Sequence, residues 1–249
     1  MIVSFGAGVL YGTRNDIANQ TPFNFGKVQE VQMDVSYTTK MLYGQNQFPL
    51  DIARGQGKVT CKAKMAVISG NALGAFFMGA AAVAGQNAMQ FGEAGTVPGV
   101  STYTIQVSQH ATFLEDLGVV YAATGLALTL VTTLTGTAGQ YTITPGTGTY
   151  TFNSTDANAA VLITYRYTIS ATGNTYTQAN QLLGFTPTFS ARFMTVRNSK
   201  PINVSLHNCV ASKYTFQTKL EDYTIPELDF DCFADAAGNI MDWSYAEVS

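Results

Sequence analysis

Two short runs decide the fold of this chain: VQMDVSY at 31–37 and KVTCKAKMAV at 58–67. In each run apolar residues occupy every second position, the period of a β-strand with one face buried. Between the runs lie residues 39–56, which include Gly44, Pro49 and Gly55. We therefore expect two strands joined by an 18-residue loop. Loops that long in compact domains are commonly functional.

The composition around these runs also favours strands. The chain has 249 residues, 32 of them Thr, and only 12% are charged. Threonine suits a pleated surface better than a helix, and so few charges argue against a coiled coil or a disordered chain. One apolar run, at 72–84 after a plausible start at Ser69, predicts a helix near 70–84 that is too short to cross a bilayer. We expect a mainly β (α+β) protein with one principal helix.

The distribution of charge predicts the domain organisation. No Lys or Arg lies between Lys64 and Arg166, and no charge of either sign between Asp116 and Asp156. Segment 112–168 is therefore predicted to be an inserted β-rich module, and 1–111 with 169–249 the core domain. Short strands are expected in the module at 118–121, 126–131, 139–143, 148–152 and 161–165. Outside it, we expect strands at 103–107, 187–193, 213–220 and 225–233, and a turn at 235–239.

The sequence has little that resembles a catalytic site. His110 and His207 stand in no metal-binding spacing, and no nucleophile motif or phosphate loop is present. The three cysteines are far apart in sequence, so we interpret them as reduced core residues. The net charge of −3 argues against a general nucleic-acid binder. We therefore predict no enzyme activity, no cofactor and no metal.

Two rows of charge remain to be explained. Glu227, Asp229 and Asp231 are spaced to share one strand face, which favours a solvated acidic surface, with a cation site or a phosphate-repelling surface as alternatives. Lys58, Lys62 and Lys64 form a basic row near Arg54. We expect this row to pair with Glu30 and Asp34 of the neighbouring strand, or else to make an intersubunit contact.

The predicted loop 39–56 is unusually apolar. Such a loop either folds back onto its own core or docks on another subunit. Asp51 and Arg54 lie at its edge, where they could set the register of a contact. The candidate interface residues are Leu42, Tyr43, Phe48, Leu50, Asp51, Ile52 and Arg54.

The order of these segments resembles the major tail-tube proteins of long-tailed, siphovirus-like bacteriophages. The similarity lies in GQGKVTCKAKMAV followed by SGNALGAFF, in the module segment GQYTITPGTGTYTFNSTDANAAVLITYRYT, and in the ending KLEDYTIPELDFDCFADAAGNIMDW. The resemblance implies a β-sandwich or barrel core with a flanking helix and an inserted β-module. It also implies hexameric rings stacked into a tube whose lumen conducts DNA, and it supplies no catalytic residues.

On this resemblance, the chain is expected in the virion tail, assembled in the host cytoplasm with tape-measure, terminator and tail-tip proteins, and without a membrane partner. Loop 39–56 is expected to make contacts between rings. The alternatives are another phage part, such as a terminator, tail-tip or decoration protein, and a carbohydrate-binding β-sandwich or adhesin. The candidate lumen-facing residues are Gln32, Asp34, Ser36, Glu227, Asp229 and Asp231.

Overall fold

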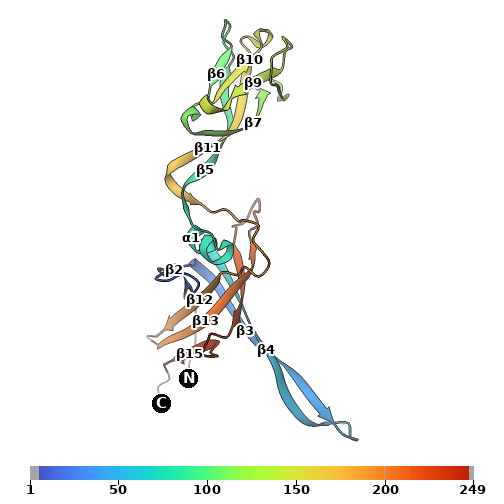
Figure 1. Cartoon of the computed structure of the whole chain (residues 1–249), viewed down its shortest axis with the longest axis vertical. Helices are drawn as coiled ribbons and strands as arrows, with labels where there is room; N and C mark the ends of the chain where they lie inside the picture. The colour runs from blue at the N-terminus through green and yellow to red at the C-terminus, as the bar shows by residue number, and fades with distance from the viewer. Residues whose placement is uncertain (1–5, 199, 247–249) are drawn as a thin grey trace. The chain divides into compact units, whose positions relative to one another are not determined.

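The computed structural model describes residues 6–198 and 200–246. Strands make up 57% of it and helical turns 8%, which confirms the mainly β prediction. The chain divides into two compact units (Figure 1). We call Met1–Ala82 with Tyr176–Ser249 the core unit, and Val83–Thr175 the inserted module.

The core unit is built on one eight-stranded sheet with the order β2-β1-β12-β13-β14-β4-β3, and β15 also pairs with β13. β2 and β3 stand at opposite ends of this order, yet only Phe25 separates them in the chain, and its amide donates to the Leu10 carbonyl at 3.0 Å. The sheet therefore curls round until its ends meet, as in a barrel. Its strands are β1 (Val9–Arg14), β2 (Phe23–Asn24), β3 (Gly26–Tyr43), β4 (Pro49–Ile68), β12 (Thr188–Arg197), β13 (Lys200–Thr215), β14 (Glu227–Phe233) and β15 (Met241–Tyr245).

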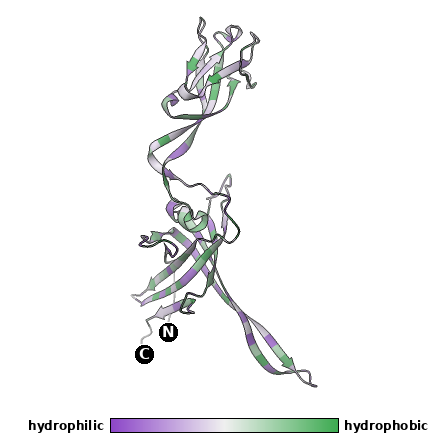
Figure 2. Cartoon of the chain, viewed as in Figure 1, coloured by the Kyte–Doolittle hydropathy of each residue, from purple (hydrophilic) through white to green (hydrophobic). Residues whose placement is uncertain are grey.

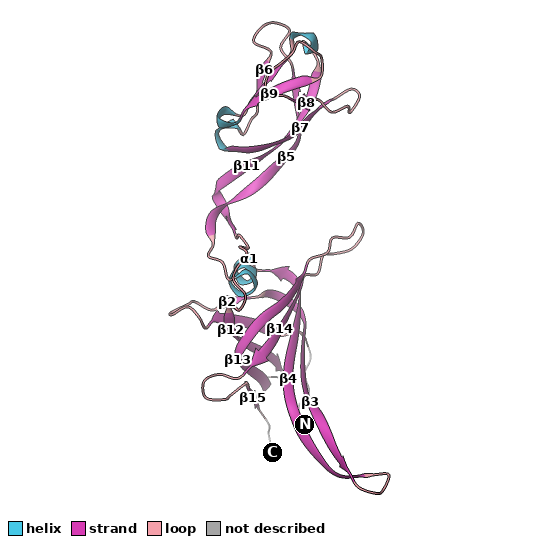
Figure 3. Cartoon of the chain, turned by 45° about the vertical axis from the view of Figure 1, so that its right-hand side comes forward, coloured by secondary structure: helices cyan, strands magenta, loops and turns pink. Residues whose placement is uncertain are grey.

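The predicted loop 39–56 is wrong. β3 and β4 continue as paired strands through most of it, from Tyr37 opposite Gly57 to Tyr43 opposite Pro49, and only residues 44–48 form the turn. β14 pairs with β4 only as far as Val59. Beyond that point no further strand of the described residues lies beside the hairpin (Figure 3). Gly44 does lie in the turn, but Pro49 begins β4 and Gly55 lies inside it, because strands that face solvent on both sides tolerate these residues.

The helix is shorter than the predicted 70–84. α1 (Gly70–Leu73) runs into a single π-helical turn, η1 (Gly74–Met78), and Gly79 ends it in the left-handed conformation with φ 61°. The helical segment packs on the barrel core through Phe76, which stacks on Phe25 at 5.0 Å and lies 4.8 Å from Phe189 between ring centroids. No helix in the described ranges is long and apolar enough to cross a membrane.

The inserted module has bounds different from the predicted 112–168. The prediction was centred on the charge-free stretch 117–155, whereas β5 (Val83–Thr96) pairs along most of its length with β11 (Ala160–Thr175) and so belongs to the module. β5, β11 and β7 (Phe113–Tyr121) form one sheet, and the second has the order β6-β10-β9-β8. The strands of the second sheet are β6 (Thr104–Gln106), β8 (Thr129–Leu130), β9 (Gln140–Thr144) and β10 (Thr149–Phe152), with short η2 (His110–Thr112), η3 (Pro145–Thr147) and η4 (Ser154–Asp156) between strands.

The module has a hydrophobic core of its own, separate from that of the core unit. Tyr141 and Tyr150 are buried in it, and both phenols donate hydrogen bonds to Asp116, at 2.6 and 2.8 Å. Tyr121 donates likewise to Asp156 at 2.6 Å. Each of these three phenol hydroxyls therefore has a carboxyl group as its hydrogen-bond acceptor. Polar groups inside a small core need such partners, because an unpaired buried polar group is unfavourable.

Near the C-terminus one predicted strand is misplaced. β13 ends at Thr215, so the strand expected at 213–220 belongs to the end of β13, and residues 216–226 form no strand. β15 was not predicted. The turn at 235–239 is present, with the Asp235 amide donating to the Asn239 carbonyl at 2.8 Å.

Candidate assembly surfaces

The distal half of the β3–β4 hairpin exposes many large apolar side chains. We call residues 37–57 the arm (Figure 2). Its large apolar side chains are at least half exposed in nearly every case, and Phe48 at the turn is 80% exposed. They are Tyr37, Met41, Leu42, Tyr43, Phe48, Leu50 and Ile52. The alternative that this segment folds back onto its own core is therefore wrong, and its apolar surface faces solvent in the single chain.

One face of the arm collects several of these side chains. Met41 is the cross-strand partner of Ile52, and the Tyr43 hydroxyl donates to Met41 Sδ at 3.2 Å. The Arg54 guanidinium lies 4.7 Å from the centre of the Tyr37 ring, a cation–π contact at the base of the same face. Opposite-facing Leu42 is paired with Asp51. The interface candidates thus form one continuous element, although they divide between its two faces.

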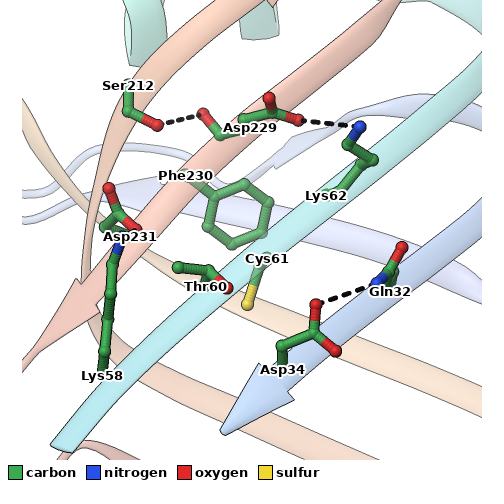
Figure 4. A pocket seen from close by; sticks show the side chains of 10 residues that line it. All are labelled: Gln32, Asp34, Lys58, Thr60, Cys61, Lys62, Ser212, Asp229, Phe230 and Asp231. Atoms are coloured by element: carbon green, nitrogen blue, oxygen red, sulfur yellow. Dashed lines mark hydrogen bonds and ion pairs between the residues drawn. The ribbon is translucent and has the colours of Figure 1, made fainter. Parts of the chain in front are cut away.

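All six lumen candidates come together on one surface of the barrel. In the register, Ser36 lies opposite Lys58, Gln32 opposite Lys62, and Lys62 in turn opposite Asp229. We call this surface of β3, β4 and β14 the charged face; it contains a shallow groove of about 340 Å³ (Figure 4). Its polar residues are Glu30, Gln32, Asp34, Ser36, Lys58, Thr60, Lys62, Lys64, Glu227, Asp229 and Asp231.

The acidic row is paired with the basic row instead of being left to solvent. Lys62 forms ion pairs with Glu227 and, at 3.9 Å, with Asp229, and Lys58 pairs with Asp231 at 3.3 Å. Of the two partners expected for the lysines, Glu30 does pair, with Lys64 at 2.7 Å. Asp34 does not; one of its oxygens accepts a hydrogen bond from the Gln32 amide at 2.8 Å.

The ion pair between Lys62 and Glu227 shifts the pKa of both residues. The hydrogen bond to Glu227 raises the pKa of Lys62, and the same contact lowers the pKa of Glu227. Lys58, Lys62 and Lys64 each lie beside a carboxylate, so the face presents neither a free basic row nor a free acidic row. Sequence reasoning missed the β4–β14 pairing, although two rows of opposite charge with the same period of two were a usable signal.

The three cysteines, distant in sequence, meet in adjacent strands. The Cys232 sulfur lies 3.4 Å from that of Cys209 and 3.9 Å from that of Cys61. All three are free, and Cys61 and Cys209 are buried, which confirms them as core residues; Cys232 is only partly buried. The neighbouring thiol and burial raise the pKa of Cys61 and of Cys209, while their two S–H groups lower that of Cys232.

The histidines hold parts of the fold together. His207 lies 2.9 Å from Asp242 of β15 and 3.5 Å from Asp235 of the turn. His110 Nδ1 is 3.1 Å from the Val107 carbonyl oxygen. Throughout the part of the chain that the structure describes, no group of three or more His, Cys, Asp or Glu residues is placed to hold a metal ion.

Comparison with known proteins gives no family assignment: no protein-family model matches the sequence, and no curated protein matches it.

Proposed function

We propose that this protein is a structural subunit that assembles with copies of itself into stacked hexameric rings, forming the tube of a phage tail through which DNA passes. The observation that carries the proposal is the arm: a two-stranded hairpin with exposed apolar side chains on both strands and, in the part of the chain that the structure describes, no third strand beside it. An isolated two-stranded hairpin is only marginally stable in water. A partner that covers the arm removes both the exposed apolar surface and the isolation of its strands.

The charged face supports the same proposal as a lumen lining. A surface that binds DNA tightly exposes lysines that can replace counterions on the phosphates. Here Lys58, Lys62 and Lys64 each have a carboxylate partner from the same chain. A lining of such internal pairs lets a polyanion slide without trapping it, which suits a conduit better than a binding site.

The test is the assembly state of the purified chain, measured by negative-stain electron microscopy and analytical ultracentrifugation. Hollow tubes or six-fold rings are expected from the unmodified protein. A first variant replaces 38–56 with a tight Asn-Gly turn; a second keeps the full arm but carries Phe48→Thr, Leu50→Thr and Ile52→Thr. Both are expected to give folded subunits or rings without tubes.

The second variant separates arm length from arm chemistry, because threonine preserves strand propensity while removing apolar area. A matched control, Leu126→Thr, changes a 66% exposed apolar residue of the inserted module. The control should form tubes of normal length. A protein that stays monomeric at every concentration, or shortened-arm chains that form normal tubes, would contradict the proposal.

A further inference from the structure

The three thiols of the core unit lie together where three adjacent strands meet. Cys209 of β13 and Cys232 of β14 are direct cross-strand partners, and their sulfur atoms are 3.4 Å apart. Cys61 of β4 is the cross-strand partner of Phe230, so it lies diagonal to Cys232, with 3.9 Å between the two sulfur atoms. All three are free thiols, and the assembly proposed above does not use them.

The strand register favours one disulfide over the others. Disulfides join residues whose Cα atoms are about 4.4–6.8 Å apart. Direct partners in antiparallel strands have Cα atoms about 4.5–5.5 Å apart, which is within that range. Diagonal neighbours are about 7–8 Å apart, too far to be bridged unless the backbone moves. Cys209 and Cys232 can therefore be joined in the existing register, whereas a bond from Cys61 to Cys232 requires the strands to shift.

Exposure decides which thiol of the pair reacts first. Cys61 and Cys209 are 4% and 0% exposed, whereas Cys232 is only partly buried and precedes the exposed Phe233. Hydrogen bonds from Cys209 and Cys61 lower the pKa of Cys232, and the thiolate is the form that attacks an oxidant. A partly exposed thiol beside a buried one has the arrangement of an attacking cysteine and its resolving cysteine.

We infer that Cys232 and Cys209 form an oxidation site for small peroxides, in which Cys232 reacts first and Cys209 completes a disulfide between β14 and β13. The Cys232 thiolate attacks one oxygen of hydrogen peroxide, the O–O bond breaks, and a sulfenic acid and hydroxide are formed. The Cys209 sulfur then attacks the Cys232 sulfur and displaces its hydroxyl group. The two thiols lose two electrons and two protons, and the peroxide becomes two molecules of water.

The disulfide would fasten the two strands that flank an irregular segment. It closes the chain from 209 to 232, and this loop contains 216–226, which forms no strand. Such a cross-link restricts the unfolded chain, so the oxidised core unit is expected to be the more stable form. The inference concerns the single subunit and does not depend on the tube proposal.

Peptide mass spectrometry of the full chain tests the pairing. Reduced protein is treated with hydrogen peroxide, blocked with N-ethylmaleimide in denaturant and digested with trypsin. The cysteines then lie in three different peptides, 59–62, 198–213 and 220–249, since trypsin does not cleave before Pro201. Peptides 198–213 and 220–249 should be joined, with the loss of two hydrogens, and 59–62 should carry the blocking group.

The same treatment in concentrated urea is the control. Without a strand register the unfolded chain should give a mixture of pairings, whereas the folded chain should give one. Three results in the folded chain would overturn the inference: a bridge to Cys61, sulfinic acid on Cys232 without a bridge, or no oxidation under conditions that oxidise the unfolded chain.

Two matched variants separate the reacting pair from the third thiol. Cys61→Ala and Cys209→Ala each remove one buried thiol, and circular dichroism checks that each variant is folded. Cys61→Ala should still form the bridge. Cys209→Ala should form no bridge within the chain and should hold Cys232 as a sulfenic acid that dimedone traps. A folded Cys61→Ala chain without the bridge would contradict the assignment, and the pairing in the unmodified chain decides the question if either variant does not fold.

Urea unfolding measures the consequence of the bond. The oxidised chain should have a higher midpoint than the reduced chain, and dithiothreitol should return it to the reduced value. An equal or lower midpoint would overturn the stabilising role. These measurements need no assembly, so a chain that forms no tubes would contradict the proposed function and leave this inference standing.

Discussion

At the scale of single residues, Gly12 shows how neighbouring aromatic rings can exclude any side chain from a position. Gly12 of β1 is buried, and a Cβ placed on it would lie 2.6 Å from the Phe76 ring and 2.8 Å from the Phe25 ring. These rings are themselves packed against Phe189 in the barrel core. A glycine is required here because the helix approaches the sheet closely. The sequence around Gly12 does not predict this requirement.

We predict that Gly12→Ala destabilises the core unit by about 1–3 kcal/mol, because the rings have little room to yield. Urea unfolding followed by circular dichroism measures the change. Gly70→Ala is the matched control: its Cβ meets nothing within 4 Å, so its effect should stay within about 1 kcal/mol. Equal effects of the two substitutions would rule out packing as the cause.

The tyrosine–carboxylate contacts predict an alkaline limit for the inserted module. Burial and the hydrogen bond to Asp156 raise the pKa of Tyr121 to about 12, and burial with the bond to Asp116 raises the pKa of Tyr141 and Tyr150 further. The unfolded phenol titrates near about 10. Because the folded pKa is the higher one, this stabilisation is complete below pH of about 10 and is lost as pH rises through the folded pKa.

Accordingly, the free energy of unfolding of the module should fall above pH of about 10. Tyrosinate absorbance and near-ultraviolet circular dichroism should show the buried phenols ionising together with loss of structure. Tyr121→Phe should weaken this pH dependence, whereas Tyr43→Phe on the arm should leave it unchanged. A module whose tyrosines all ionise near the ordinary pKa while it remains folded would contradict the prediction.

At the scale of elements, the charged face shows how strand pairing changes the meaning of a charge pattern. β14 alone carries three carboxylates on one face, as its alternation with buried Leu228 and Phe230 predicted. Beside β4 those carboxylates become partners of lysines. The acidic row that the sequence favours as a solvated surface is, in the sheet, half of a set of ion pairs.

We predict that Lys62→Met lowers stability more at low salt than at high salt, because screening weakens the exposed pairs that it removes. Unfolding midpoints measured from about 10 mM to about 1 M salt should converge on those of the unmodified chain. Lys40→Met is the control, since Lys40 has no ion pair in the described part of the arm. A salt-independent difference for Lys62→Met would mean that packing of its aliphatic stem accounts for the effect.

At the scale of the whole molecule, the chain forms two compact units and passes between them twice, at 82–83 and at 175–176. Val83 is the cross-strand partner of Thr175, so the module leaves and rejoins the core unit at one place. The two hydrophobic cores share no residue. The module therefore has what a domain needs to fold alone, and the core unit has a barrel that is complete without it.

We predict that a chain with 83–175 replaced by a short Gly/Ser linker folds cooperatively, and that 83–175 expressed alone folds as well. Thermal unfolding of each piece, compared with the intact chain, checks both statements. The contrasting deletion of 112–168 should aggregate, because it removes most of β11 and leaves β5 as an unpaired edge. If removal of 83–175 unfolds the core unit, the two units are not independent.

The sequence by itself determined the features that repeat over a few residues. Period-two alternation located β3, β4, β14 and the opposite faces of β14, and high threonine with low charge determined the mainly β class. A helix after Ser69 and a turn at 235–239 were likewise local. Each of these depends on neighbouring residues in the chain, whose spacing is written directly in the order of amino acids.

Only the tertiary structure decided which strands lie side by side. It curled the sheet so that its end strands β2 and β3 come together, extended the hairpin into the predicted loop, set the module bounds at 83 and 175, and brought Lys62 to Glu227 and Cys232 to Cys209. An alternating pattern states that a strand has a buried face but not which strand pairs with its edge. That choice is made by the packing of the whole core, where residues distant in sequence compete for the same neighbours.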